Sequence, residues 1–386
     1  MSKIKLPNPF IYTLGRLFWS QPKVRKMGVR FDKKALKQIK PPMLVLANHT
    51  GKQDFHIVGA ALSPYRCNFV GAVNTAVGRK KLFEKMGVLT KRQFTVSMQL
   101  VRDIKALFDK NAVVVIYPEA RLSADGRLSD IPQSVVKLIK LCGVNTVAVK
   151  AEGSYLHNNK CTNFERKIPI SCALSIVSKK EEIAQLSNRE IYRRLIAALD
   201  YDDFKYAKEN NIKIARPALR LDGILYRCPL CNEEFSIKSD DTALRCACCG
   251  GAFSVDGQGA LNCPQSSIDS VAKWFDFERE QIKNSLSPHY RYEALCDVFA
   301  IADGGFKAIG EMTLIHDFSG FTLKDAKEEI FFDGRHLHAI SYDPASCIYL
   351  STDDATFKIA PKENPYIATK LAITQEEIFK FCRQTD

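Results

Sequence analysis

The sequence has no long hydrophobic run. None of its apolar stretches reaches the roughly 18–20 residues that a helix needs to cross a bilayer, and no secretory signal is recognised at the N-terminus. Internal repeats and long low-complexity tracts are also missing. The hydrophobic share of 46% excludes a disordered chain. We therefore expect a globular protein that is cytoplasmic, or peripheral on the cytosolic face of a membrane.

Acidic residues are scarce relative to basic ones. The chain has 43 Asp and Glu against 56 Lys and Arg, a net charge of +13. The excess is concentrated in residues 1–40, which contain eleven basic residues and one acidic residue, Asp32. Such asymmetry favours an anionic partner, either nucleic acid or an acidic membrane surface.

Residues 1–40 are expected to form a basic, amphipathic membrane-binding arm. An apolar stripe recurs at helical spacing and comprises Phe10, Ile11, Leu14, Leu17 and Phe18. Trp19 and Tyr12 are residue types found at the level of lipid headgroups. The nearby basic residues that would attract acidic lipids are Lys3, Lys5, Arg16, Lys23, Arg25 and Lys26. The alternative is a helix packed on its own domain.

A first polar motif follows the apolar run at residues 43–47, which predicts a buried strand. His49 lies just beyond it, at the strand end where open α/β sheets bind ligands. Residues five apart do not share a helix face, so Asp54 can meet His49 only if Thr50-Gly51 forms a turn. A carboxylate beside an imidazole orients the ring for proton transfer. A surface turn with incidental polar residues is the alternative for this motif alone.

A second motif follows the apolar run at residues 112–117, which also predicts a buried strand. This strand delivers Glu119 and Arg121 to its end, before a turn at residues 123–126. Two strand ends that each carry charged groups indicate one shared crevice.

Together the two motifs resemble the glycerolipid acyltransferase family, of which the PlsC-type 1-acyl-glycerol-3-phosphate acyltransferase is the type member. The family's Asn-His-x4-Asp block is matched by Asn48-His49-x4-Asp54, and its Phe-Pro-Glu-Gly-Thr-Arg block by residues 117–121. The resemblance covers about residues 40–180. The second block departs from the pattern because it is one residue shorter and lacks the glycine, and residues 144–149 lack the prolines of the family's fourth block.

The resemblance implies an enzyme that transfers a fatty acyl group from acyl-CoA or acyl-carrier protein to a lysophospholipid hydroxyl, as in 1-acyl-glycerol-3-phosphate. This reaction belongs to phospholipid biosynthesis or remodelling and needs no metal. His49 would be the general base and Asp54 would orient it. By the same resemblance, the residues that would bind the acceptor are Glu119, Arg121, Arg92 and Lys91.

Strand-like and helix-like runs alternate through the predicted acyltransferase domain, residues 41–215. Expected strands span 43–47, 68–73, 112–117, 145–151 and 169–176, and expected helices span 54–62, 97–109 and 132–141. This alternation predicts an α/β fold with a largely parallel sheet.

Residues 224–262 are expected to form a zinc ribbon. The chain has 13 cysteines, and two Cys-x2-Cys pairs are separated by 14 residues: Cys228, Cys231, Cys246 and Cys249. Two such pairs are the signature of a closed, structural tetrahedral zinc site. Asn232 and Gly250 can take the left-handed turns that follow each pair, and Cys248 and Cys263 are left over.

Residues 265–386 are expected to form a small β-rich domain. Short strand-like runs span 292–301, 306–316, 328–332, 336–342, 347–351 and 355–360, with a hairpin at Asp333-Gly334. A helix over 374–383, with Thr374 near its N-terminus, closes the chain. This order fits a small barrel or sandwich such as a pleckstrin-homology domain, which by itself implies no activity.

Two other functions remain open at this stage. The ribbon and the basic arm would suit a nucleic-acid-binding protein, although bulky aliphatic residues between the basic ones suit lipid better. The altered second and fourth blocks would suit a non-catalytic lipid-binding scaffold on an acyltransferase fold.

Overall fold

The computed structural model describes residues 5–94, 98–302 and 305–385, so residues 1–4 of the predicted arm and residue 97 of the predicted helix lie outside it. The chain forms two compact units. The N-terminal unit comprises Met1–Lys91, Val96–Asn159 and Phe164–Ile212. The C-terminal unit comprises Arg92–Thr95, Lys160–Asn163 and Lys213–Asp386.

The N-terminal unit is built on a seven-stranded sheet of order β1-β7-β6-β2-β5-β3-β4. The strands are β1 (Arg30–Asp32), β2 (Met43–Ala47), β3 (Cys67–Ala72), β4 (Leu89–Lys91), β5 (Val113–Ile116), β6 (Asn145–Glu152) and β7 (Ser171–Ser178). All neighbours are parallel except β6 and β7. The prediction of a largely parallel sheet is therefore confirmed.

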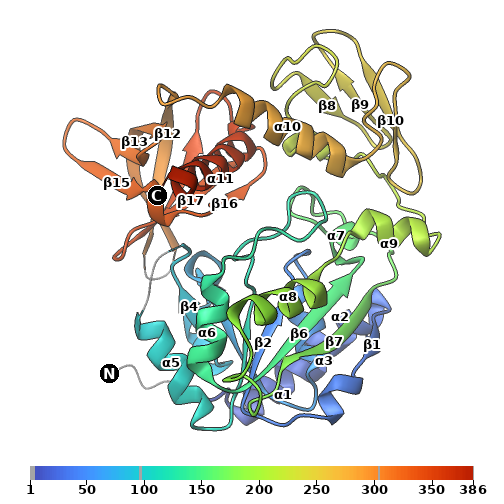
Figure 1. Ribbon diagram of the computed structural model, residues 1–386. Coiled ribbons are helices and arrows are strands. Elements are labelled where there is room, and N and C mark those ends of the chain that lie inside the picture. The colour runs from blue at the N-terminus through green and yellow to red at the C-terminus, as the bar shows by residue number, and fades with distance from the viewer. Residues whose placement is uncertain (1–4, 95–97, 303–304, 386) are drawn as a thin grey trace. The chain divides into compact units, whose positions relative to one another are not determined.

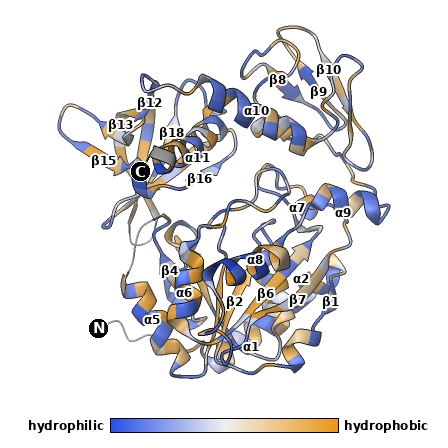
Figure 2. Ribbon diagram, viewed as in Figure 1, coloured by the Kyte–Doolittle hydropathy of each residue, from blue (hydrophilic) through white to orange (hydrophobic). Residues whose placement is uncertain are grey.

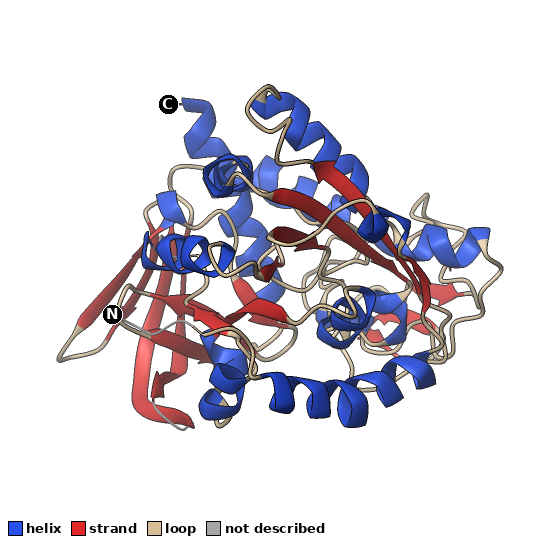
Figure 3. Cartoon of the chain, turned by 90° about the horizontal axis from the view of Figure 1, so that it is seen from below, coloured by secondary structure: helices blue, strands red, loops and turns tan. Residues whose placement is uncertain are grey.

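Helices cover both faces of this sheet. They are α1 (Pro9–Gly15), α2 (Gln21–Met27), α3 (Asp54–Ala61), α4 (Lys80–Lys85), α5 (Met98–Phe108), α6 (Ser134–Cys142), α7 (Ser154–His157), α8 (Asn188–Leu199) and α9 (Asp203–Glu209). Short 3-10 helices span Lys34–Lys37 and Val73–Ala76. Figure 1 shows α5, α6 and α8 in front of the strands, and Figure 3 shows helices on both sides of them.

The burial of β2 explains why its sequence is apolar without alternation. Met43, Val45 and Ala47 pack in the core that includes α2 and α3, whereas Leu44 and Leu46 pack in the core that includes α5, α6 and α8. A parallel strand buried on both faces has no position for a polar side chain. The strand is accordingly hydrophobic along its whole length (Figure 2).

The predicted strands and helices of this unit are confirmed to within two residues at their ends. The two edge strands, β1 and β4, were not expected from the sequence. Each has three residues, too few to establish a periodic pattern.

The expected amphipathic helix is present as α1, a π-helical turn (Arg16–Ser20) and α2. Its predicted apolar stripe is largely solvent-exposed, with relative exposures of 70% for Phe10 and 77% for Phe18. Tyr12, expected at headgroup level, is instead buried, because its hydroxyl accepts the backbone N–H of Cys67 (3.2 Å). In the part of the chain that the structure describes, no helix combines the length and apolarity needed to cross a membrane.

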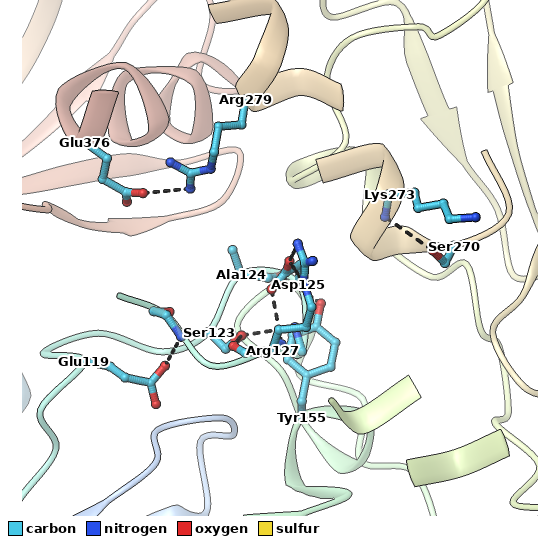
Figure 4. Close-up of polar contacts among 12 residues, drawn as sticks. Glu119, Ser123, Ala124, Asp125, Arg127, Tyr155, Ser270, Lys273, Arg279 and Glu376 are labelled. Carbon is cyan, nitrogen blue, oxygen red and sulfur yellow. Dashed lines mark hydrogen bonds and ion pairs between the residues drawn. The ribbon is translucent and has the colours of Figure 1, made fainter. Parts of the chain in front are cut away.

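The first part of the C-terminal unit is a four-stranded antiparallel sheet of order β11-β10-β9-β8. It follows a 3-10 turn (Leu221–Gly223), and its strands are β8 (Ile237–Ser239), β9 (Ala243–Cys246), β10 (Ala252–Val255) and β11 (Leu261–Asn262). Helix α10 (Val271–Ser285) comes next, and Ser270 caps it by accepting the backbone N–H of Lys273 (3.3 Å; Figure 4). The buried indole of Trp274 donates to the carbonyl of Arg227 (2.8 Å), which fastens α10 to this sheet.

The second part is a seven-stranded antiparallel sheet of order β15-β14-β13-β12-β18-β17-β16, closed by α11 (Ile367–Thr385). The strands are β12 (Arg291–Ala302), β13 (Gly305–Asp317), β14 (Gly320–Lys324), β15 (Glu329–Asp333), β16 (Ser341–Asp343), β17 (Cys347–Ser351) and β18 (Thr356–Pro361). Arg279 of α10 pairs with Glu376 and Glu377 of α11 at 2.7 and 2.6 Å, which joins the two parts (Figure 4).

Three details expected for this region are wrong. No hairpin forms at Asp333-Gly334: β15 pairs with β14, β16 pairs with β17, and a 3-10 turn (Gly334–His336) lies between them. Gly334 is needed because its backbone lies against Gly320, where a Cβ would be 3.0 Å from the Gly320 Cα. Thr374 lies inside α11, which begins at Ile367, and the strand expected over 336–342 begins only at Ser341. Strand β14 and helix α10 were not expected.

Candidate active site

His49 and Asp54 meet across the turn between β2 and α3. Asp54 is the first residue of α3, and its Oδ2 lies 3.0 Å from His49 Nδ1. The same oxygen accepts the backbone N–H groups of Thr50 (2.6 Å) and Gly51 (3.0 Å). The turn at Thr50-Gly51 is therefore what brings the two side chains together, as the sequence required.

The hydrogen bond to Asp54 fixes the tautomer of His49. An ionised carboxylate only accepts hydrogen bonds, so Nδ1 carries the proton and Nε2 has a free electron pair. The imidazole stacks on the ring of Tyr117 at a centroid distance of 4.2 Å and keeps 27% of its side chain exposed. One ring nitrogen is thus bound to a buried carboxylate while the ring still reaches solvent.

The loop that contains the second motif forms hydrogen bonds with the backbone of His49 in the first motif. Glu119 is 1% exposed and accepts the N–H groups of His49 (2.7 Å) and Ser129 (2.8 Å). The carbonyl of His49 accepts the N–H of Ser123 (2.8 Å). Both backbone groups of His49 are therefore bound by the loop that follows β5.

Burial raises the pKa of Glu119 to about 8, although the N–H groups of His49 and Ser129 oppose the shift. The family resemblance implied that Glu119 binds the acceptor, whereas both of its oxygens accept backbone N–H groups in the structure.

Asn48, the first residue of the Asn-His motif, extends the sheet beyond the end of β2. Its side-chain amide donates to the carbonyl of Ala151 and accepts the N–H of Ala151, both at 2.8 Å. These two hydrogen bonds take the place of backbone–backbone hydrogen bonds where β2 diverges from β6, and they position the next residue, His49.

The loop after Glu119 folds back on itself (Figure 4). Asp125 binds the guanidinium of Arg127, with Oδ2 2.7 Å from Nε, and Tyr155 donates to the carbonyl of Ala124 (2.8 Å). Arg121 belongs to this loop and is only 9% exposed. Ala120 has a φ of 57°, the left-handed region that favours glycine, which is the residue the family pattern has there.

Lys91 and Arg92 are consecutive but lie in different surroundings. Lys91 ends β4 in the N-terminal unit, where burial lowers the pKa of its ammonium group. Arg92 belongs to the C-terminal unit, where its guanidinium donates to the carbonyl of Asp354 (2.5 Å).

A third group at this site is not marked by any sequence motif. Ser154, the first residue of α7, donates to Asp54 Oδ1 at 2.6 Å, and both residues are 1% exposed. Ser154 lies 100 residues from Asp54, so no local pattern links them. Its position just after the predicted strand at 145–151 was the available signal, because it lies at a strand end.

The four cysteines of the two Cys-x2-Cys pairs converge in the C-terminal unit. Their sulfur atoms all lie within 4.8 Å of one another, with Cys228–Cys249 at 3.8 Å and Cys231–Cys246 at 3.7 Å. Four sulfurs about 2.3 Å from a central zinc would be about 3.8 Å apart, so the cluster has the dimensions of a tetrahedral thiolate site.

The turns after each pair support this assignment. Asn232 and Gly250 have φ values of 66° and 73°, so the expected left-handed turns are confirmed. Cys248 is exposed and Cys263 is buried elsewhere, and neither belongs to the cluster.

Comparisons with known proteins concern the part of the chain that contains both motifs. No curated protein matches the chain. Among solved structures, the chain is similar to the 1-acyl-sn-glycerophosphate (LPA) acyltransferase PlsC from Thermotoga maritima, with 13% sequence identity. The match covers 48% of this chain and 91% of that chain. Its TM-score of 0.33 is too low to carry an argument. Residues 28–151, which contain both motifs, match the family model described as Acyltransferase, so the chain contains an enzyme domain of the acyltransferase family.

Proposed function

We propose that this protein transfers a fatty acyl group from an acyl thioester to a hydroxyl group of a lysophospholipid, with His49 as the general base. The observation that carries the proposal is the contact between His49 Nδ1 and Asp54 Oδ2 inside the acyltransferase-family domain. This contact leaves Nε2 of a partly exposed imidazole to accept a proton.

The reaction follows from this arrangement. His49 Nε2 takes the proton of the acceptor hydroxyl, and the oxygen attacks the thioester carbonyl. The resulting imidazolium is stabilised by Asp54. The tetrahedral intermediate expels the donor thiolate, which receives the proton from His49. The acyl group passes directly to the acceptor, so no acyl-enzyme is required.

The acceptor is proposed to carry a phosphate, as 1-acyl-glycerol-3-phosphate does. Arg121 of the N-terminal unit can bind a phosphate with two parallel N–H donors, and Lys91 of the same unit is a second candidate contact. Glu119 acts mainly by holding the backbone of His49. Either acyl-CoA or acyl-carrier protein can serve as donor, since both present the same thioester.

We further propose that the N-terminal helices bind the cytosolic face of an acidic membrane. The proposal is supported by five exposed apolar side chains on α1 and the π-helical turn: Phe10, Leu14, Leu17, Phe18 and Trp19. Eleven basic residues among the first 40 supply attraction to acidic lipids. A peripheral enzyme in this position has direct access to lysophospholipid, consistent with a role in phospholipid synthesis or remodelling.

In the C-terminal unit, we propose a structural zinc ion held by Cys228, Cys231, Cys246 and Cys249. All four positions are protein ligands, so the ion would stabilise the fold and take no part in acyl transfer. The following seven strands and single closing helix support the proposal of a pleckstrin-homology-like domain, which is a statement about fold alone.

The experiment that tests the proposed reaction is acyl transfer by the purified protein to a panel of lysophospholipids, with acyl-CoA and acyl-carrier protein as donors. His49→Ala should lower kcat by about 10²–10⁴-fold, which is the usual contribution of a general base. The matched control is His289→Ala, because His289 is exposed and lies in the C-terminal unit.

Wild-type turnover in His49→Ala, at an unchanged melting temperature, would refute the role of His49. No transfer to any acceptor by the wild-type protein would instead favour a non-catalytic lipid-binding scaffold.

A further inference from the structure

The carboxylate of Asp54 is held on both of its oxygens. Oδ2 accepts His49 Nδ1 and the N–H groups of Thr50 and Gly51, whereas Oδ1 accepts the hydroxyl of Ser154 at 2.6 Å. Asp54 and Ser154 are both 1% exposed, so water does not readily replace a lost donor. A hydrogen bond from a neutral donor to a buried carboxylate is among the stronger ones in proteins.

The position of Ser154 is fixed by the start of α7. Asp203 accepts the backbone N–H groups of Gly153 (2.9 Å) and Tyr155 (2.8 Å), the residues on either side of Ser154. Tyr155 also donates to the carbonyl of Ala124 in the loop of the second motif. The serine is therefore anchored by two elements distant in sequence, α9 and the 117–127 loop.

The turn that carries Asp54 fits closely against this serine. A Cβ at Gly51 would lie 2.5 Å from the Ser154 carbonyl oxygen and 2.6 Å from its Oγ. Only glycine allows the two backbones to approach so closely. This close approach is what lets the short serine side chain reach Oδ1 of Asp54.

We propose that Ser154 is a positioning residue that completes a His49–Asp54–Ser154 relay and orients the Asp54 carboxylate for His49. The inference rests on the proposed function of His49 as base. Ser154 acts through Asp54 and does not touch the substrate. A nucleophilic role is not supported, because its hydroxyl is buried and bonded to a carboxylate whose other oxygen faces the histidine.

This role makes a specific kinetic prediction. Ser154→Ala should lower kcat by about 10–100-fold, the worth of one hydrogen bond to a charged group, while KM for the lysophospholipid stays within about twofold. The matched control is Ser178→Ala, because Ser178 is also fully buried and its hydroxyl has no hydrogen-bond partner among the described residues.

A double-mutant cycle tests whether Ser154 acts through Asp54. Once Asp54→Asn has been made, adding Ser154→Ala should change kcat by less than about twofold, because the relay is already broken. Additive losses would overturn the proposal, as would an unchanged kcat in Ser154→Ala. If Ser154→Ala does not fold, Ser154→Cys replaces it, because a thiol is close in size to the hydroxyl but is a weaker hydrogen-bond donor. The kcat should again fall by about tenfold, and an unchanged kcat would overturn the proposal.

A second readout does not depend on turnover. The imidazole NMR signals of His49, identified by their loss in His49→Ala, should shift in Ser154→Ala and stay in place in Ser178→Ala. Unshifted signals would overturn the relay even if acyl transfer is observed. Shifted signals in a protein that transfers no acyl group would support the relay and refute the proposed function.

Discussion

Replacing Ala120 with glycine should stabilise the N-terminal unit. Ala120 has a φ of 57°, and its N–H donates to the carbonyl of Tyr117 (3.0 Å) in the turn that presents Glu119. An L-residue in the left-handed region costs about 1–2 kcal/mol, which glycine does not incur. Glycine also gives the unfolded chain more conformational freedom, which lowers the free energy of unfolding by roughly 0.5–1 kcal/mol.

The difference lies between about 0 and 1.5 kcal/mol, so we expect Ala120→Gly to raise the free energy of unfolding by about 0.75 kcal/mol. For a unit of about 200 residues, this raises the melting temperature by about 1–4 °C. The two units need not unfold together, so the assay should report on the N-terminal unit alone. Hydrogen exchange of β2 and β5 peptides across a urea series does so.

The matched control has the opposite expected sign. Ala197 is exposed within α8, where the backbone is right-handed, and Ala197→Gly should lower the free energy of unfolding by about 1 kcal/mol. The reasoning fails if Ala120→Gly also destabilises the unit, since Ala120 would then not be strained.

Three further predictions concern pH, metal and membrane. Burial raises the pKa of Asp203 from 3.8 to about 7, so the folded chain keeps a proton that the unfolded chain releases. The free energy of unfolding should therefore fall as pH rises from about 4 to about 7. In Asp203→Asn, urea titrations should show a smaller fall over the same range. An equal dependence of the unfolding free energy on pH in the two proteins would contradict this. Cys228→Ser or Cys246→Ser should remove about one zinc ion per chain in metal analysis and expose the ribbon to protease, and unchanged metal content would refute the site. Phe10→Ser combined with Phe18→Ser should weaken sedimentation with acidic vesicles by about tenfold, and wild-type binding would mean that another surface contacts lipid.

The core of the N-terminal unit was predictable because its physics is local. A strand buried on both faces must be apolar throughout, so the runs around Val45 and Val115 identified β2 and β5. Charged residues just beyond such runs had to lie at the same edge of a parallel sheet. The sequence pattern alone therefore places His49 near Glu119, and the structure shows the His49 N–H donating to the Glu119 carboxylate.

What the sequence did not reveal depends on contacts between distant segments. Ser154 has no motif and becomes part of the site only because the Gly51 turn lies against α7. The hairpin expected at Asp333-Gly334 was wrong for a similar reason, since this glycine is needed for contact with Gly320 rather than for a two-residue turn. A glycine in the sequence indicates either a close backbone contact or a turn that needs conformational freedom, but it does not show which of the two is present.

If the N-terminal helices bind a membrane as proposed, they also set how far the Asp54 carboxylate lies from its surface. The ring of Trp19, at the end of the exposed apolar stripe, lies 4.7 Å from that of His56, only two residues beyond Asp54 in α3. Two helical residues rise about 3 Å, a small fraction of the roughly 30 Å hydrocarbon thickness of a bilayer. A lysophospholipid could then react without leaving its leaflet, and the rate would follow its mole fraction in the surface rather than its bulk concentration. Diluting the acceptor with inert lipid at constant total acceptor should slow such an enzyme.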